Sequence, residues 1–448
     1  MKWRILILLC LIISNTCLSK NNIVTETNKY IVSLKKVTDV MVVDVASPVA
    51  ASRYYAYITL ASYECISVFN NKTNPSFSGF INGYENIVID PMIIKESDTK
   101  LAAILSILKS GQKLLPSGYL LDKDIALLKK KYSIDKQHKN KFKQTSNLVD
   151  AIIANVLSYA KKDGFNKLNN LPRYINKEGN GYWKQTPPTF MLPIEPHWNS
   201  LRTFLLDSAQ QFKPAAPIKY DTLKNSDFYN LVNEVYQNSL HQNENQKKSA
   251  LFWDCNPFAV QRLGHIEFGI KKISPGGHWI GITGIACKKI KASIEKTALT
   301  HVLVSLSMAD AFIACWDEKY RSNRVRPETA IQNIFDRGWK PLLQTPPFPE
   351  YVSGHSVVSS TAADVLTQIF GDNFTYLDDT EVEFDLPVVQ FSSFNAAAQE
   401  ASISRLYGGI HFRDAIEQGN ILGKRVSGLT ISRLGVFFQR VKSSPPVQ

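Results

Sequence analysis

Helical periodicity of apolar residues runs through most of this chain and limits the folds open to it. In LAAILSILKSGQKLL and SNLVDAIIANVLSYAKK, apolar residues recur at the three- and four-residue spacing of one helix face. The run ALTHVLVSLSMADAFIACWDEKY indicates a long helix in the C-terminal half. A section rich in Val, Phe and Thr, residues 374–392, is expected to form a hairpin. We therefore predict an all-α fold, a helical bundle with long connecting loops.

The predicted bundle is a single domain over residues 20–448. Its composition is ordinary for a globular protein with ample core, because 44% of the residues are hydrophobic and 20% are charged. We expect a mostly helical part at about 28–164 and a long ordered loop at 165–222, which is rich in Asn, Pro and aromatic residues. The last part covers about 290–440.

That last part contains further helices besides the long one. One is expected to begin near Ser353 and to stop at Gly371. Two more are expected near 393–406 and 411–436, after the hairpin.

The chain opens with MKWRILILLCLIISNTCLSK, in which two basic residues precede an apolar run and then mostly small or polar residues. This is the pattern of a secretory signal peptide over residues 1–19, too short to span a membrane. We expect cleavage after Ser19, with lipid attachment at Cys17 as the less favoured alternative, and therefore an exported protein, periplasmic or secreted. No later stretch has about eighteen uninterrupted apolar residues, so we expect no transmembrane segment in the mature chain.

The formal net charge is +13, and part of the excess lies in KKKYSIDKQHKNKFK, residues 129–143. Aromatic residues are not interleaved there, so a solvated helix face is a better interpretation than a nucleic-acid site, and we expect no nucleic-acid partner. A basic surface still attracts anions toward any site that it surrounds.

Outside the signal peptide, the cysteines are widely spaced and stand in apolar surroundings. Without a CxxC pair they provide no argument for a zinc site, and we expect buried free thiols. His265 and His278 show no ligand spacing and are expected to be satisfied core histidines. The four cysteines are Cys65, Cys255, Cys287 and Cys315.

In KYRSNRVRP, Lys319 and Arg326 stand seven residues apart, which on a helix is two turns and nearly the same face. Pro327 disfavours helix at Arg326, so we expect this arginine at the helix end, pointing out of it. Two cations on one face repel each other unless an anion or a carboxylate lies between them. Taken alone, the stretch favours a solvated basic helix end.

FPEYVSGHSVVSSTAADVL brings Ser353, Gly354 and His355 to the first turn of a helix. Free backbone N–H groups and the helix dipole favour an anion there, and glycine allows close backbone approach. His355 can accept or give a proton. The simpler alternative is that Ser353 only caps the helix.

SRLYGGIHFRD adds Arg405 and His411, which can point to one place only if the chain turns at Gly408-Gly409. The three segments together offer the cations, hydroxyl, backbone N–H and histidines that a highly charged tetrahedral oxyanion needs, such as phosphate or a phosphate mimic. One histidine would act as covalent ligand or nucleophile, and the other as acid or base.

These segments resemble the signature of the vanadium-dependent haloperoxidases and type 2 phosphatidic acid phosphatases, K-x6-RP, PSGH and SR-x5-H-x3-D. The resemblance covers residues 319–414, with Val352 in place of the proline and Asp414 one place early. It implies the haloperoxidase type of helical bundle and one vanadate per chain. In that interpretation His411 binds vanadium and His355 manages protons as hydrogen peroxide enters. The residues that bind the vanadate oxygens would be Lys319, Arg326, Ser353, Gly354 and Arg405.

Haloperoxidase and phosphatase share this oxyanion site, so its surroundings must separate them. Trp316, three residues before the lysine, and Phe348, five before the serine, resemble the haloperoxidase halide pocket, although plain core packing also explains them. The phrases PPFPEYVSGHS and SRLYGGIHFRD resemble the bacterial branch that includes iodoperoxidases. We therefore predict oxidation of halide, iodide or bromide first, by hydrogen peroxide to hypohalous acid.

Two alternatives remain open at this point. An exported acid phosphatase would use His411 as nucleophile, His355 as acid and Asp414 to orient His411. A binding protein for phosphate or vanadate would use the same cations without turnover. The oligomeric state does not follow from the sequence.

Overall fold

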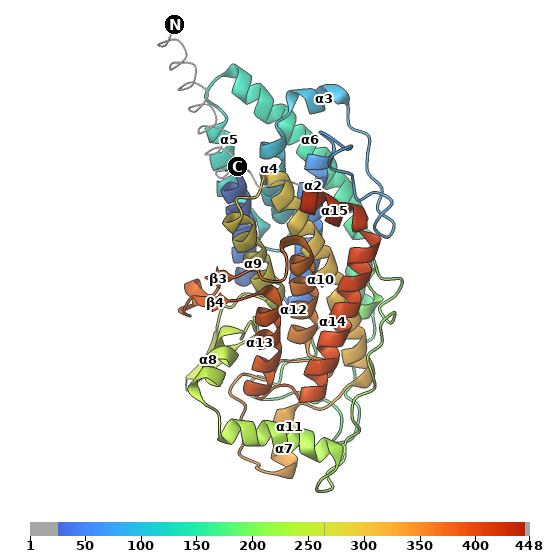
Figure 1. Ribbon diagram of the computed structural model, residues 1–448, viewed down its shortest axis with the longest axis vertical. Helices are drawn as coiled ribbons and strands as arrows, with labels where there is room; N and C mark the ends of the chain where they lie inside the picture. Colours follow the sequence, from blue (N-terminus) through green and yellow to red (C-terminus); the bar gives the residue numbers. More distant parts are fainter. Residues whose placement is uncertain (1–25, 264, 444–448) are drawn as a thin grey trace.

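The computed structural model describes residues 26–263 and 265–443 as an elongated helical bundle with two short hairpins (Figure 1). The predicted signal peptide and Cys17 lie outside these residues. The α-helices are a helix over residues 26–43, α2 (Pro48–Ser67), α3 (Pro91–Glu96), α4 (Thr99–Leu114), α5 (Asp122–Lys131), α6 (Lys136–Lys161), α7 (Asp227–Leu240), α8 (Glu244–Phe252), α9 (Pro275–Lys289), α10 (Ile294–Ser322), α11 (Pro327–Ile334), α12 (Gly354–Phe370), α13 (Phe394–Tyr407), α14 (Arg413–Arg433) and α15 (Gly435–Ser443).

The predicted all-α class is confirmed. The strands form two antiparallel pairs, the second of which lies within the predicted hairpin segment 374–392. Short 3₁₀ turns interrupt the connections. The strands and these turns are β1 (Val260–Leu263), β2 (Ile266–Gly269), β3 (Tyr376–Asp378), β4 (Val389–Phe391), η1 (Gly118–Leu121), η2 (Phe165–Asn170), η3 (Trp198–Ser200) and η4 (Val382–Phe384).

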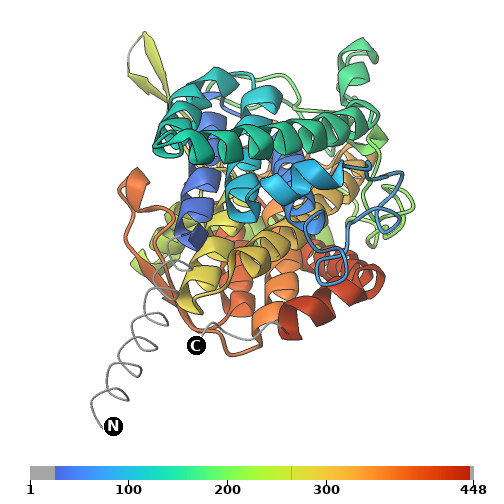
Figure 2. The same ribbon diagram turned by 90° about the horizontal axis from the view of Figure 1, so that it is seen from above.

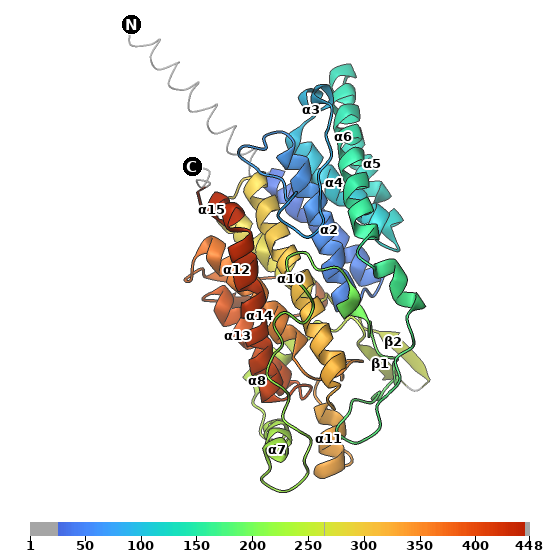
Figure 3. The same cartoon turned by 90° about the vertical axis from the view of Figure 1, so that its right-hand side faces the viewer.

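Helix α10 lies in the middle of the bundle, where it packs against α2, α9, α12 and α14 (Figures 1 and 3). Every residue from Thr297 to Lys319 is buried. By length and composition α10 resembles a membrane span, but its apolar stretch is entirely covered by the rest of the fold. The largest cluster of buried apolar side chains extends from Tyr30 to Val441, so the N- and C-terminal helices share this core. Figure 2 shows the helices from above.

The helix ends that carry the predicted site residues lie where the sequence places them. The side chain of Ser353 caps α12, and Gly371 ends this helix. Helix α13 ends at Tyr407, and Gly409 follows with φ +75°, a conformation that a glycine adopts without strain. The chain therefore does turn between Arg405 and the histidine after it, as predicted.

One prediction about helix geometry was wrong. Lys319 and Arg326 do not share a helix face, because α10 ends at Ser322 and Asn323 takes a left-handed conformation with φ +53°. Arg326 has an extended backbone and directly precedes Pro327, the first residue of α11. Arg326 is outside the helix, as its place before Pro327 predicts, but it lies four residues beyond the end of α10. Both cations are buried, so the expectation of a solvated basic helix end was wrong.

The long loop at 165–222 is tied to the bundle core by Asp310, a fully buried carboxylate in the middle of α10. Its oxygens accept hydrogen bonds from the backbone N–H groups of Phe204 (2.7 Å), Leu205 (2.6 Å) and Leu206 (2.9 Å). Burial raises the pKa of Asp310 to about 6, and these three bonds limit the rise. A charged residue that interrupts the apolar helix thus positions the loop that passes over it.

We expect Asp310→Ala to lower the free energy of unfolding by about 3–5 kcal/mol, because it leaves three buried N–H groups without an acceptor. Asp372→Ala, at an exposed carboxylate, should change it by less than about 0.5 kcal/mol. Urea unfolding followed by circular dichroism measures both. A loss below about 1 kcal/mol for Asp310→Ala would contradict this account of the loop.

Other expectations from the sequence have mixed outcomes. The four cysteines of the described residues are free and buried, as predicted. His278 is fully buried. His265, in contrast, lies exposed at the tip of the β1–β2 hairpin, so its assignment to the core was wrong.

Candidate active site

Lys319 lies in the last turns of α10 and is completely buried. Its Nζ donates to the carbonyl oxygens of Pro349 (3.0 Å), Glu350 (3.1 Å) and Val352 (2.6 Å), in the segment just before α12. Burial lowers the pKa of Lys319 to about 7, and the positive charge of Arg326 acts in the same direction. The lysine thus both positions this segment and places a cation at its inner side.

Arg326 is also fully buried, and its guanidinium reaches across to the segment before α14. Nε donates to the carbonyl of Phe348 (2.9 Å). Nη1 donates to the carbonyl of Ile410 (2.8 Å) and approaches Nε2 of His411 at 3.1 Å. Nη2 is buried and has no hydrogen-bond partner among the described residues. Burial lowers the pKa of Arg326 to about 10, so the group remains a cation at neutral pH.

The protonation state of His411 follows from its two neighbours. Nδ1 lies 2.9 Å from Oε1 of Glu350, and a carboxylate accepts a hydrogen bond from a nitrogen that carries a proton. Nε2 faces Arg326, which can only donate. Both contacts fit a neutral ring with its proton on Nδ1, while the unprotonated Nε2 accepts the hydrogen bond from Arg326. Burial, followed by the charge of Arg326, holds the pKa of His411 well below its usual value, which agrees with a neutral ring.

His355 and Arg405 complete the group of buried polar side chains. The ring of His355 makes a hydrogen bond with the backbone of Trp253, whereas its Nε2 is buried without a partner. Burial, with the charge of Arg405, holds its pKa well below the usual value. Arg405 donates from Nε to Ser404 Oγ (3.1 Å) and from Nη2 to the carbonyl of Ala250 (3.1 Å). His355 is therefore a neutral base next to a buried cation.

The start of α12 lies between these groups. Ser353 caps the helix by accepting from the N–H of Ser356 (3.3 Å), so the capping role considered above is present. Gly354 is the first helical residue, and a Cβ built on it would lie 3.8 Å from the Trp316 ring and 3.9 Å from Lys319 Cε. The first N–H groups of a helix have no partner inside it, which favours an anion here.

Gly354, His355, Arg405 and His411 line a cavity of about 30 Å³, whereas Lys319, Arg326 and Ser353 lie outside its lining. The rings of Trp316 and Phe348 contact each other at a centroid distance of 4.9 Å and form its apolar side. The ammonium group of Lys319 lies next to these rings, with Nζ 5.2 Å from the Phe348 ring centroid. The lining residues are Pro48, Asp254, Cys255, Asn256, Pro257, Pro275, Phe312, Trp316, Pro346, Phe348, Gly354, His355, Arg405, Ile410 and His411.

Comparison with solved structures shows which family this site belongs to. The chain matches the crystal structure of a bacterial vanadium-dependent iodoperoxidase with a TM-score of 0.85 and 39% sequence identity, over 91% of this chain and 96% of that chain. The chain belongs to the vanadium-dependent haloperoxidases. No curated protein sequence matches it significantly.

More distant haloperoxidases share the fold. A holo structure and an apo structure of a bacterial vanadium-dependent chloroperoxidase match with TM-scores of 0.67 and 0.66, each at 15% identity and over 89% of this chain, and over 94% and 95% of those chains. The family model for the VCPO second helical-bundle domain matches residues 300–440. That region contains all the oxyanion-binding candidates.

The phosphatase alternative requires Asp414 to orient His411. In this haloperoxidase Asp414 does not contact His411. Arg324 lies between Asp414 and Glu350: its Nη2 donates to Asp414 Oδ1 (2.7 Å) and its Nε to Glu350 Oε2 (2.7 Å). Glu350 is the carboxylate that holds His411. Asp414 lies in the first turn of α14, and its side chain contacts Arg324.

Sequence reasoning missed Glu350, Arg324 and the cavity wall at 254–257. Glu350 stands three residues before Ser353 within FPEYVSGH, and Arg324 stands two before Arg326. Their positions within the two motifs could have indicated that Glu350 and Arg324 lie near the site. Nothing comparable marks the wall segment, which follows α8 far from the motifs.

The lowered pKa of Lys319 predicts a pH-dependent affinity for tetrahedral anions. Lys319 is a cation below about pH 7 and becomes neutral above it, so sulfate affinity should fall above pH 7 by up to about tenfold per pH unit. Sulfate keeps its charge over this range, so the change reports the protein. Isothermal titration calorimetry from pH 6 to 9 measures it.

Lys319→Met serves as the matched variant for this measurement. It should bind sulfate weakly and lose most of the pH dependence, because no ammonium remains to titrate. A wild-type affinity that stays constant between pH 6 and 9 would contradict the assigned role of Lys319.

Proposed function

We propose that this haloperoxidase holds one vanadate per chain in the cavity and oxidises iodide with hydrogen peroxide to hypoiodous acid. One observation carries the proposal. Among the described residues, Arg326 Nη2 and His355 Nε2 are buried polar atoms without hydrogen-bond partners. Nη1 of the same arginine donates to His411 Nε2, and His355 lines the cavity together with His411. Buried polar atoms without partners are costly unless a ligand pairs with them.

The residues present fit a tetrahedral oxyanion whose metal needs one nitrogen ligand. The ligand atom would be Nε2 of His411, which is neutral and fixed in direction by Glu350. Arg326, Arg405 and the N–H of Gly354 would neutralise and hold the oxygens, with Ser353 and Lys319 next to them. When bound, vanadate supplies the Lewis-acidic centre that polarises hydrogen peroxide.

The remaining chemistry belongs to side chains of this chain. His355 is neutral at physiological pH, so its Nε2 can take a proton from incoming hydrogen peroxide and return it to the leaving water. Trp316 and Phe348 exclude water on the side from which a halide would approach, and their polarisable rings suit a large anion. Iodide is favoured because it is the halide most easily oxidised.

The activity test compares substrates on the vanadate-loaded protein. Hydrogen peroxide with iodide, bromide or chloride should give halide oxidation, fastest with iodide, whereas p-nitrophenyl phosphate should be hydrolysed slowly or not at all. Vanadate-inhibited ester hydrolysis without oxidation of any halide would establish the phosphatase instead. Vanadate binding with neither activity would leave a binding protein.

Two substitutions separate the ligand from its support. His411→Ala should abolish vanadate binding and iodide oxidation, because it removes the nitrogen ligand. Glu350→Gln should weaken vanadate binding by about 10–100-fold, because the ring of His411 loses the carboxylate that fixes its proton and its direction. Equilibrium dialysis against vanadate measures both, with His265→Ala in the exposed hairpin as the control. Full vanadate affinity in His411→Ala would show that the site is elsewhere.

A further inference from the structure

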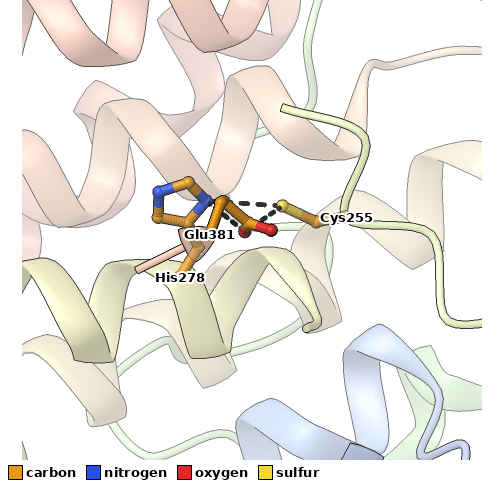
Figure 4. Close-up of side chains that lie close together, drawn as sticks. All are labelled: Cys255, His278 and Glu381. Atoms are coloured by element: carbon orange, nitrogen blue, oxygen red, sulfur yellow. Dashed lines mark hydrogen bonds and ion pairs between the residues drawn. The ribbon is translucent and has the colours of Figure 1, made fainter. Parts of the chain in front are cut away.

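A second group of potential ligands lies beside the vanadate cavity. Cys255 comes from the loop after α8, His278 from the first turn of α9, and Glu381 from the segment after β3 (Figure 4). All three side chains are buried. Their ligand atoms point toward one another, although the residues are separated by 23 and 103 positions in the sequence. None of the three is a residue assigned above to binding the oxyanion.

The distances between the ligand atoms match those of a metal site. Cys255 Sγ lies 3.5 Å from His278 Nδ1 and 3.7 Å from Glu381 Oε1, and the last two atoms are 3.1 Å apart. Around a tetrahedral zinc ion with usual bond lengths, the corresponding separations are about 3.6, 3.6 and 3.4 Å. The three atoms therefore already form one face of a coordination tetrahedron, and an ion fits between them with little movement.

The histidine of this group is held as a metal ligand usually is. Asp378 Oδ2 lies 2.9 Å from His278 Nε2, so Nε2 carries the proton that faces Asp378 and Nδ1 is directed at the other two ligands. Asp378 is in turn fixed by the N–H (3.1 Å) and the hydroxyl (2.6 Å) of Thr380. The ring of Trp253 stacks on His278 with a centroid distance of 4.5 Å. A carboxylate behind the coordinating histidine is the usual support of zinc sites.

We infer that Cys255, His278 and Glu381 form a zinc site in the wall of the vanadate cavity. A thiolate and an imidazole with one carboxylate favour zinc over magnesium or calcium, which bind oxygen ligands. The fourth position would be taken by water or by the second carboxylate oxygen of Glu381. Binding releases two protons to solvent, the thiol proton of Cys255 as the zinc–sulfur bond forms and the Nδ1 proton of His278 as the zinc–nitrogen bond forms.

The electrostatic surroundings also favour a cation at this place. Burial lowers the pKa of His278, but the charge of Asp378 and the hydrogen bonds with Asp378, Cys255 and Glu381 together outweigh burial and raise this pKa well above its usual value. Without zinc, a protonated His278 would supply the positive charge, and its ring would be hydrogen-bonded to Asp378, Cys255 and Glu381. The zinc site and this cluster differ in metal content, which an experiment can measure.

The site would also stiffen the active centre. Cys255 contributes to the cavity lining together with Asp254, Asn256 and Pro257. Zinc would join this wall to His278 of α9 and to Glu381 after β3, two residues outside the cavity lining. The stiffening of the active centre rests on the proposed vanadate site. The presence of zinc does not depend on that proposal.

The test measures zinc in the full-length protein. After chelation and addition of zinc, elemental analysis should find one tightly bound zinc per chain. Cys255→Ser should lower zinc affinity by at least about 100-fold. Loss of a residue that only hydrogen-bonds to a metal ligand lowers affinity by about 10–100-fold, and loss of the ligand itself costs more. Cys287→Ser, at a buried thiol farther along α9, should keep full affinity. His411→Ala should also retain zinc, which separates this site from the vanadate site.

Cobalt gives a second readout that does not depend on a folded variant. Wild-type protein loaded with Co²⁺ should show a thiolate-to-cobalt charge-transfer band, because Cys255 is the only thiol in the group. A wild-type chain that binds neither zinc nor cobalt, or that binds cobalt without this band, would overturn the inference. Zinc retained at full affinity by Cys255→Ser would overturn it as well.

Discussion

The buried carboxylate of Glu350 is the interaction on which the rest of the active centre depends. It lies 2.9 Å from His411 Nδ1, accepts the N–H of Phe412 at 2.9 Å, and pairs with Arg324. A buried charge persists only where such partners surround it. Because Glu350 accepts from Nδ1 of the imidazole, Nε2 of His411 is left unprotonated. The nitrogen that we propose as the vanadium ligand is thus selected by a residue outside the cavity lining.

The cations around His411 are held in a way that preserves their charge for a ligand. Lys319, Arg326 and Arg405 donate mainly to backbone carbonyls instead of pairing with carboxylates. Burial lowers the pKa of each, because the positive charge is removed from water. The oxyanion that we propose would offset this cost, and the cations would be organised in advance for it.

Much of this arrangement could be predicted from the sequence, because its determinants are local. Helical periodicity, the cap at Ser353 and the turn at Gly409 follow from short-range rules. The contact between Glu350 and His411 joins residues 61 positions apart, and a single carboxylate has no spacing that announces its partner. The direction of Asp414 was missed for a related reason, since it depends on where Arg324 lies. The group of Cys255, His278 and Glu381 was not predicted, because its residues come from three separate parts of the chain.

The central claim is that His411 presents an unprotonated Nε2 to an oxyanion held by buried cations. A crystal structure of the protein soaked in vanadate tests it most directly. The account predicts the anion in the cavity, bonded through vanadium to His411 Nε2 and contacted by Arg326 Nη2, with Glu350 still at Nδ1. Vanadate bound elsewhere, or a His411 ring turned away from Glu350, would contradict it.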